Sequence, residues 1–144
     1  MTEHTKKLGI LNIDSDIEED SGNITISLTE DNFIEVCVSQ THKYGMTAEI
    51  ELNIVEFQRV TKALEQARNL IFNDVFHRER FAVDTIYVNG ISSSRQGMII
   101  VNVFEESIIL VVSLTHGGDP DIMINKQLIS ELIKLFQTAE ASIN

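Results

Sequence analysis

The stretch TAEIELNIVEFQRVTKALEQA, residues 47–67, and the stretch GDPDIMINKQLISELIKLFQTAE, residues 118–140, determine which fold we expect. Each contains apolar residues at every second position, such as Ile50 and Leu52 in the first stretch and Ile122 and Ile124 in the second, which is typical of a half-buried strand. Each then continues with apolar residues three or four positions apart, such as Phe57, Val60 and Leu64, which is typical of an amphipathic helix. The chain therefore contains a strand followed directly by a helix, twice.

The two stretches align at a constant shift of 72 positions. Gly45 falls on Gly117, Ile50 on Ile122, and Asn53 on Asn125. The apolar helix positions also coincide across this shift. A single shift that covers turn, strand and helix indicates an internal repeat with a long period.

Further strands are predicted before each of the two units, because apolar residues alternate with polar ones there. The segments of the first half are 8–14, 23–29, 33–40 and 48–54, and those of the second half are 84–92, 98–104, 108–114 and 121–125. Residues 72–82 connect the halves without a Gly/Ser linker, and the second helix is expected over about 126–141. The sequence predicts an α+β fold of two ββββα units, 8–72 and 84–141, with mainly antiparallel sheets and one helix per unit packed on a sheet face. Residues 1–144 are expected to form one merged domain.

Two strands of the second half are apolar on both faces. In MIIVNVF, residues 98–104, one face carries Ile99, Val101 and Val103, and the other carries Met98, Ile100 and Phe104. A strand that is apolar on both sides is normally covered on both sides. We therefore expect a homodimer with an interface built from Met98, Ile100 and Phe104, with Arg95 and Glu105 near its rim.

The chain is acidic, with 22 Asp and Glu against 11 Lys and Arg and a net charge of −11. This charge disfavours long-range attraction to nucleic acids and anionic membranes. Residues 14–20, DSDIEED, concentrate the negative charge, although a calcium-binding EF-hand is not expected because Glu19 stands at the position that needs glycine. A solvated acidic loop that binds a basic partner surface is favoured, and its residues are Asp14, Asp16, Glu18, Glu19 and Asp20.

The single cysteine, Cys37, allows no internal disulfide and favours a cytoplasmic location. No apolar run approaches the roughly 20 residues that span a bilayer. HGGD, residues 116–119, allows either a His116–Asp119 catalytic pair or a glycine turn, and the turn is favoured. SSSRQG, residues 92–97, allows a phosphate site or a polar loop, and the loop is favoured. We expect no enzyme activity, no cofactor and no metal site.

Four strands followed by a helix, present twice, resemble the Whirly and transcriptional-coactivator group of single-stranded-DNA-binding proteins, and PUR repeats share this element order. The resemblance is carried by IELNIVEFQRVTKAL and IMINKQLISELIKLF. It implies helices on one side of the sheets and basic and aromatic strand residues facing nucleic acid. Here the predicted solvent-facing strand residues include Glu35, Glu49 and Glu51, and the Lys-Gly-Lys stretch of that group is absent. The function we predict is thus a non-catalytic binding or regulatory module for a protein partner with a basic surface, such as a nucleic-acid-binding protein. The alternative is a Whirly-like single-stranded nucleic-acid-binding protein.

Overall fold

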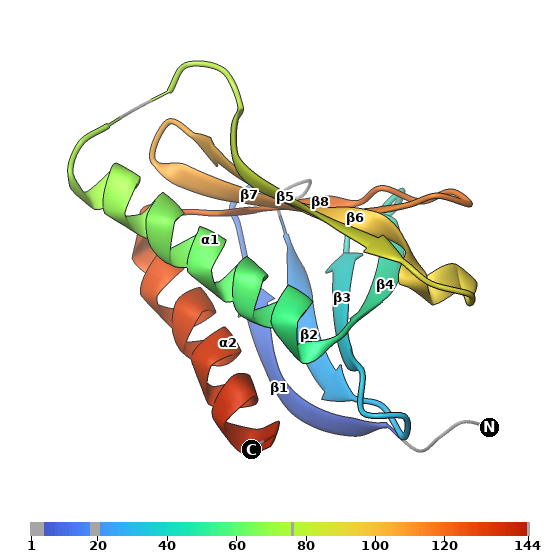
Figure 1. Cartoon of the computed structure of the whole chain (residues 1–144). Helices are drawn as coiled ribbons and strands as arrows, with labels where there is room; N and C mark the ends of the chain where they lie inside the picture. The colour runs from blue at the N-terminus through green and yellow to red at the C-terminus, as the bar shows by residue number, and fades with distance from the viewer. Residues whose placement is uncertain (1–4, 18–20, 76, 144) are drawn as a thin grey trace.

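A computed structural model describes residues 5–17, 21–75 and 77–143, and it shows the expected order of four strands and a helix, twice (Figure 1). The first half contains β1 (Lys6–Ile13), β2 (Gly22–Leu28), β3 (Ile34–Gln40), β4 (Thr47–Leu52) and α1 (Ile54–Phe72). The second half contains β5 (Phe81–Asn89), the 3-10 turn η2 (Ser93–Arg95), β6 (Gln96–Phe104), β7 (Ser107–Leu114), β8 (Asp121–Ile124), the 3-10 turn η3 (Lys126–Leu128) and α2 (Ile129–Ile143).

The strands form two separate antiparallel sheets, each in simple chain order. The first sheet has the order β1-β2-β3-β4 and the second has the order β5-β6-β7-β8. Hairpin connections produce this order, because each strand returns antiparallel beside the strand that precedes it. The predicted α+β class and the predicted four-stranded antiparallel units are therefore confirmed.

Alternation along the strands separates a buried face from an outer face in both sheets. In β3, Ile34, Val36 and Val38 are fully buried, whereas Glu35 and Cys37 between them are half-buried. In β6, Ile99, Val101 and Val103 are fully buried in the same way. The buried side chains of both halves join in one hydrophobic cluster, so the sheets and helices share a single core.

The helix α1 begins at a complete capping box. The backbone N–H of Glu56 donates to the side-chain oxygen of Asn53 at 2.8 Å, and the Glu56 carboxylate accepts from the backbone N–H of Asn53 at 2.8 Å. These bonds satisfy two N–H groups that a helix start leaves without intrahelical partners. Asn125 occupies the equivalent position before η3, but its side chain makes no capping hydrogen bond.

The helices contact mainly the strands of the opposite half. Helix α1 lies against β5 and β6, and α2 lies against β1 and, less extensively, β2. The sequence instead suggests that each helix covers the strands that precede it. The difference arises because only Asn53 separates β4, an edge strand, from α1, and α1 leads away toward the second sheet (Figure 1).

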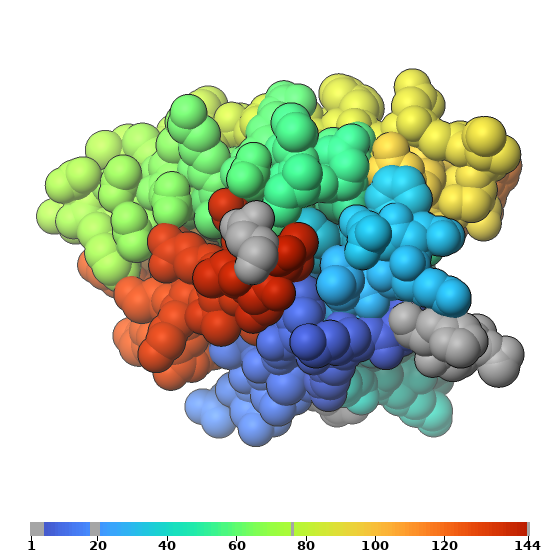
Figure 2. All heavy atoms as spheres, turned by 60° about the horizontal axis from the view of Figure 1, so that its bottom comes forward, coloured from blue at the N-terminus to red at the C-terminus, as the bar shows by residue number. Residues whose placement is uncertain are grey.

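The exchange of helices gives the chain an approximate two-fold arrangement. The two sheets also meet reciprocally, because β4 contacts β7 and β3 contacts β8. The helices pack side by side, with α2 next to β1 (Figure 2). The rings of Phe57 and Phe136 stack between them at a centroid distance of 5.1 Å. Neither helix, within the described part of the chain, has the length and apolarity needed to span a membrane.

Candidate functional site

The register of the β3–β4 hairpin brings three carboxylates together on the outer face of the first sheet. Glu35 pairs with Glu51, and Cys37 pairs with Glu49. The backbone N–H of Gln40 donates to the Met46 carbonyl, so these two residues form a hydrogen-bonded pair. Hydrogen-bonded and non-hydrogen-bonded pairs alternate along an antiparallel ladder, so Cys37–Glu49 and Glu35–Glu51 are both non-hydrogen-bonded pairs. Side chains approach most closely in such non-hydrogen-bonded pairs. The hairpin thus forces three acidic side chains into one small area.

This crowding changes the titration of the groups involved. Partial burial, a hydrogen bond with Glu49 and the charges of Glu49 and Glu51 raise the pKa of Glu35 to about 7. Burial and the charges of Glu49 and Glu35 raise the pKa of Cys37 to about 11. Both shifts have the same origin, because an additional negative charge is unfavourable in a partly desolvated site that already contains carboxylates.

No ion pair among the described residues joins Glu35, Glu49 or Glu51 to a cation. The ion pairs that the structure shows are Arg59–Asp84, Arg80–Asp121, Arg95–Glu56 and Lys126–Glu106. The described residues also contain no group of three or more His, Cys, Asp or Glu side chains arranged to hold a metal ion. The three carboxylates therefore form an acidic site whose charge is not compensated within this part of the chain.

The carboxylates line a groove that runs along β4, at the edge of the first sheet. The groove has a volume of about 550 Å³. One wall is formed by β3 and β4, with Glu35, Thr47, Glu49 and Glu51, and the other comes from the second half of the chain, with Ser93, Ser94, Leu114, His116 and Gly117. We call this space the β4 groove. A further hollow of about 530 Å³ shares the three glutamates and is also lined by Glu30 and Asp31, which extends the acidic surface.

The HGGD and SSSRQG motifs, which lie about 20 residues apart in the sequence, both contribute to the far wall of the β4 groove. His116 of HGGD lies in the turn after β7, and its Nε2 is 2.6 Å from Oε1 of Gln96. Ser93 and Ser94 of SSSRQG belong to η2. The predicted glycine turn is confirmed, with Gly117 and Gly118 at φ values of +114° and +98°. His116 therefore contributes a polar, exposed wall of the groove.

Arg95 follows Ser94 of the groove wall and joins the two halves of the chain. Its Nη1 donates to the backbone carbonyl of Glu51 at 2.9 Å and to the carboxylate of Glu56 at 2.8 Å. The guanidinium also lies 4.7 Å from the ring centroid of Phe33, and only 12% of its side chain is exposed. Sequence reasoning predicts Arg95 at the rim of a dimer interface, and the structure shows its guanidinium engaged in contacts within the chain.

The other predicted interface residues lie on or beside the outer face of the second sheet. Met98, Ile100 and Phe104 alternate with the buried residues of β6 and are half-buried. Glu105 follows in the tight β6–β7 turn, with φ of 53°. Arg95 and Glu105 thus stand at opposite ends of β6, and the interface itself stays a prediction.

The two described residues of the predicted acidic partner-binding loop, Asp14 and Asp16, do not line the β4 groove. Asp14 and Asp16 are exposed and follow β1, whereas Glu18, Glu19 and Asp20 lie outside the described residues. Neither Asp14 nor Asp16 lines the two hollows that contain the three glutamates.

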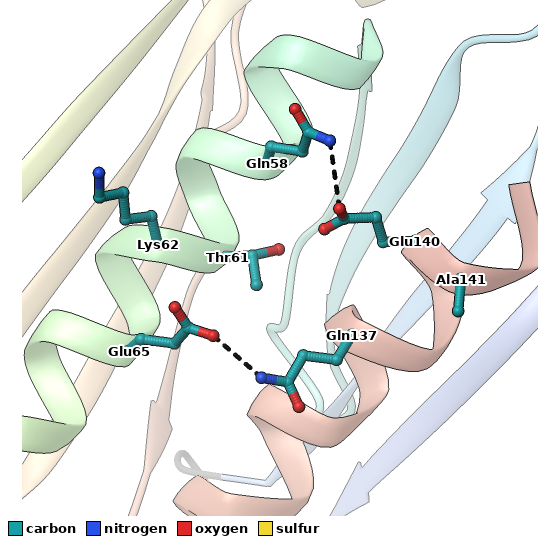
Figure 3. A pocket seen from close by; sticks show the side chains of 7 residues that line it. All are labelled: Gln58, Thr61, Lys62, Glu65, Gln137, Glu140 and Ala141. Carbon is teal, nitrogen blue, oxygen red and sulfur yellow. Dashed lines mark hydrogen bonds between the residues drawn. The ribbon is translucent and has the colours of Figure 1, made fainter. Parts of the chain in front are cut away.

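A second groove lies between α1 and α2 (Figure 3). Its walls are joined by two hydrogen bonds, from Gln58 to Glu140 at 3.1 Å and from Gln137 to Glu65 at 2.9 Å, while Lys62 points away from α2. These polar side chains already bind one another across the helix pair. The helix groove is therefore explained by helix packing, and the β4 groove is the stronger candidate site.

Comparison of the sequence with protein-family models and with curated proteins finds no match.

Proposed function

We propose that the protein is a non-catalytic binding module whose β4 groove holds a lysine- or arginine-rich segment of a protein partner. The observation that carries this proposal is the crowding of Glu35, Glu49 and Glu51 without a cation among the described residues. A positive charge placed between these carboxylates would relieve their mutual repulsion and restore the ionised form of Glu35. The groove is thus electrostatically complementary to a basic segment.

The thiol of Cys37, which pairs with Glu49 across the hairpin, is poorly suited to covalent catalysis. A pKa of about 11 keeps Cys37 protonated near neutral pH, whereas a nucleophilic cysteine needs a thiolate. The exposed surface of Glu49 and Thr47 also allows water into the site, so individual charge pairs formed there are weak and sensitive to salt. These features favour reversible binding to a basic protein surface over a chemical reaction.

The alternative is a Whirly-like protein that binds single-stranded nucleic acid. The repeated four-stranded sheets support this comparison at the level of element order. Binding of single strands relies on a basic groove with aromatic stacking platforms. The carboxylates of the β4 groove would repel a phosphate backbone, so the protein partner is favoured.

The test is a titration of a fluorescein-labelled peptide with alternating lysine and valine residues, followed by fluorescence anisotropy. We expect Glu49→Gln and Glu51→Gln each to weaken binding by about three- to fivefold, because each removes one partly exposed charge pair. Glu79→Gln is the matched control, since Glu79 is exposed in the connection before β5, away from the groove, and its replacement changes the net charge equally.

An equal loss of affinity in Glu49→Gln and Glu79→Gln would show that only net charge matters and would contradict the proposal. Tight binding of a labelled oligothymidine, unaffected by Glu49→Gln, would favour the alternative function.

A further inference from the structure

The β4 groove contains an unpaired strand edge as well as carboxylates. Because Gln40 and Met46 form a hydrogen-bonded pair, the backbone groups of Thr47, Glu49 and Glu51 point away from β3. The carbonyl of Glu51 is taken by Arg95. Among the described residues, the N–H and C=O groups of Thr47 and Glu49 have no hydrogen-bond partner.

Each of the other three sheet edges has a feature that β4 lacks, either a register irregularity or a very short strand, whereas β4 shares with β5 and β8 a side-chain donor, Arg95 at the Glu51 carbonyl. The β1 and β5 strands each carry a register irregularity and lie against a helix, and Arg59 also donates to the Thr85 carbonyl of β5 at 3.2 Å. The β8 strand is only four residues long, and the Gln40 side chain donates to its Asp121 carbonyl at 2.8 Å. By contrast, β4 pairs with β3 over six consecutive residues without a shift. An open, regular edge is a ready template for another strand.

From these observations we propose that the partner segment binds as an additional antiparallel strand beside β4. This inference rests on the proposed function, because it specifies how the same groove holds its basic ligand. The backbone groups of Thr47 and Glu49 supply four positions for hydrogen bonds, and extended peptides are commonly bound by such edge addition. Antiparallel addition continues the pattern of the first sheet, in which each neighbouring pair is antiparallel.

The geometry also defines the spacing of the basic residues. Thr47, Glu49 and Glu51 carry their side chains on the outer face, and Ser39 Oγ lies 2.7 Å from Thr47 Oγ1 on that face. Ligand residues directly opposite Glu49 and Glu51 would place their side chains on the same face, because cross-strand partners share a face. The preferred ligand is therefore a short extended segment with lysine or arginine at every second position.

A second copy of this chain is a poor occupant of the same edge. Antiparallel pairing of two β4 strands would set Glu49 and Glu51 against the same acidic strand of the other molecule. Like charges placed directly opposite each other destabilise a strand pair. The charge of the groove thus selects a basic segment over self-association.

The experiment uses the full chain and three synthetic peptides with the same lysine and valine sequence. One peptide is unmodified, one carries N-methyl groups on the backbone nitrogens of the lysines, and one carries them on those of the valines. In the antiparallel arrangement the lysines opposite Glu49 and Glu51 turn their N–H groups toward β4, whereas the valine N–H groups point away. We expect lysine N-methylation to weaken binding at least tenfold and valine N-methylation to weaken it less than threefold.

The outcomes distinguish a failure of strand addition from a failure of the proposed basic-ligand function. If all three peptides bind equally and binding still depends on Glu49, strand addition is wrong while the basic-ligand function stands. Equal loss from both methylation patterns, or a greater loss from valine methylation, also overturns antiparallel addition. If the unmodified peptide does not bind at all, the proposed function itself fails, and the strand addition with it.

Discussion

At the scale of single residues, Glu35 shows how a strand register creates an electrostatic property. Its neighbours across the hairpin are acidic, so its pKa rises from 4.5 to about 7. The folded protein therefore retains a proton between these two pH values that the unfolded chain has already released. By linkage, the contribution of Glu35 to the free energy of unfolding decreases as the pH rises from 4.5 to about 7. It is most favourable to folding below pH 4.5 and least favourable above about pH 7.

This pH dependence predicts how removal of the Glu35 charge changes stability. Glu35→Gln replaces the carboxylate by a neutral side chain of similar shape, so it should stabilise the protein relative to wild type at pH 8 more than at pH 5. The difference between the two pH values should be about 1 kcal/mol, reduced from the full linkage value because the site is partly open to solvent. Urea denaturation at both pH values measures it, with Glu79→Gln as control. An identical effect of Glu35→Gln at both pH values would show that Glu35 has an ordinary pKa.

At the scale of elements, the internal repeat provides a matched pair of helix starts. Asn53→Ala removes the capping box of α1 and should lower the free energy of unfolding by about 1 kcal/mol. Asn125→Ala, at the equivalent position, removes no capping hydrogen bond and should cost only a few tenths of that. Chemical denaturation of the two variants provides the comparison, and equal losses would mean that the cap does not distinguish the two helices.

The strands and helices could be predicted because their residue periods are local properties of the sequence. Alternation in β3 and β6, and the apolar spacing after Asn53, are sufficient to place these elements. The exchange of the helices between the halves could not be predicted in this way. An amphipathic face indicates that a helix packs on something, and it does not indicate which sheet.

Only part of the candidate site can be predicted from the sequence, because local patterns do not contain strand register or long-range packing. Glu35, Glu49 and Glu51 could be assigned to the solvent-facing side of their strands from alternation alone. Their clustering depends on the register of the β3–β4 hairpin, and the far wall of the groove depends on long-range packing that brings η2 and the turn after β7 beside β4. The HGGD and SSSRQG motifs are each visible in the sequence, but no local signal indicates that they lie together.

At the scale of the whole molecule, the approximate two-fold arrangement leaves the two sheets with different outer faces. The first sheet presents Glu35 and Glu49, whereas the second presents Met98, Ile100 and Phe104. These three apolar side chains are half-buried, and the surface that they leave exposed could be covered by a second subunit. We therefore retain the homodimer as a proposal, with the second sheet as its interface and the β4 groove left open to the partner.

Replacement of Ile100 by Asp tests this assembly. The unpaired carboxylate would lie in the interface, so Ile100→Asp should dissociate the dimer while the helix content of each subunit stays unchanged. Light scattering at micromolar concentration should give a wild-type mass of about twice 16.2 kDa and a variant mass near 16.2 kDa. Circular dichroism provides the control for folding. A wild-type mass near 16.2 kDa would contradict the dimer.

We propose the β4 groove as the surface that binds the partner segment. The most direct test of this proposal is to map amide chemical shift changes in the isotopically labelled full chain as the unmodified lysine–valine peptide is added. If the peptide binds in the β4 groove, the largest changes should fall on Thr47 to Glu51, with further changes at Ser93, Ser94 and His116. Changes concentrated at Asp14 and Asp16, or along the groove between α1 and α2, would contradict it.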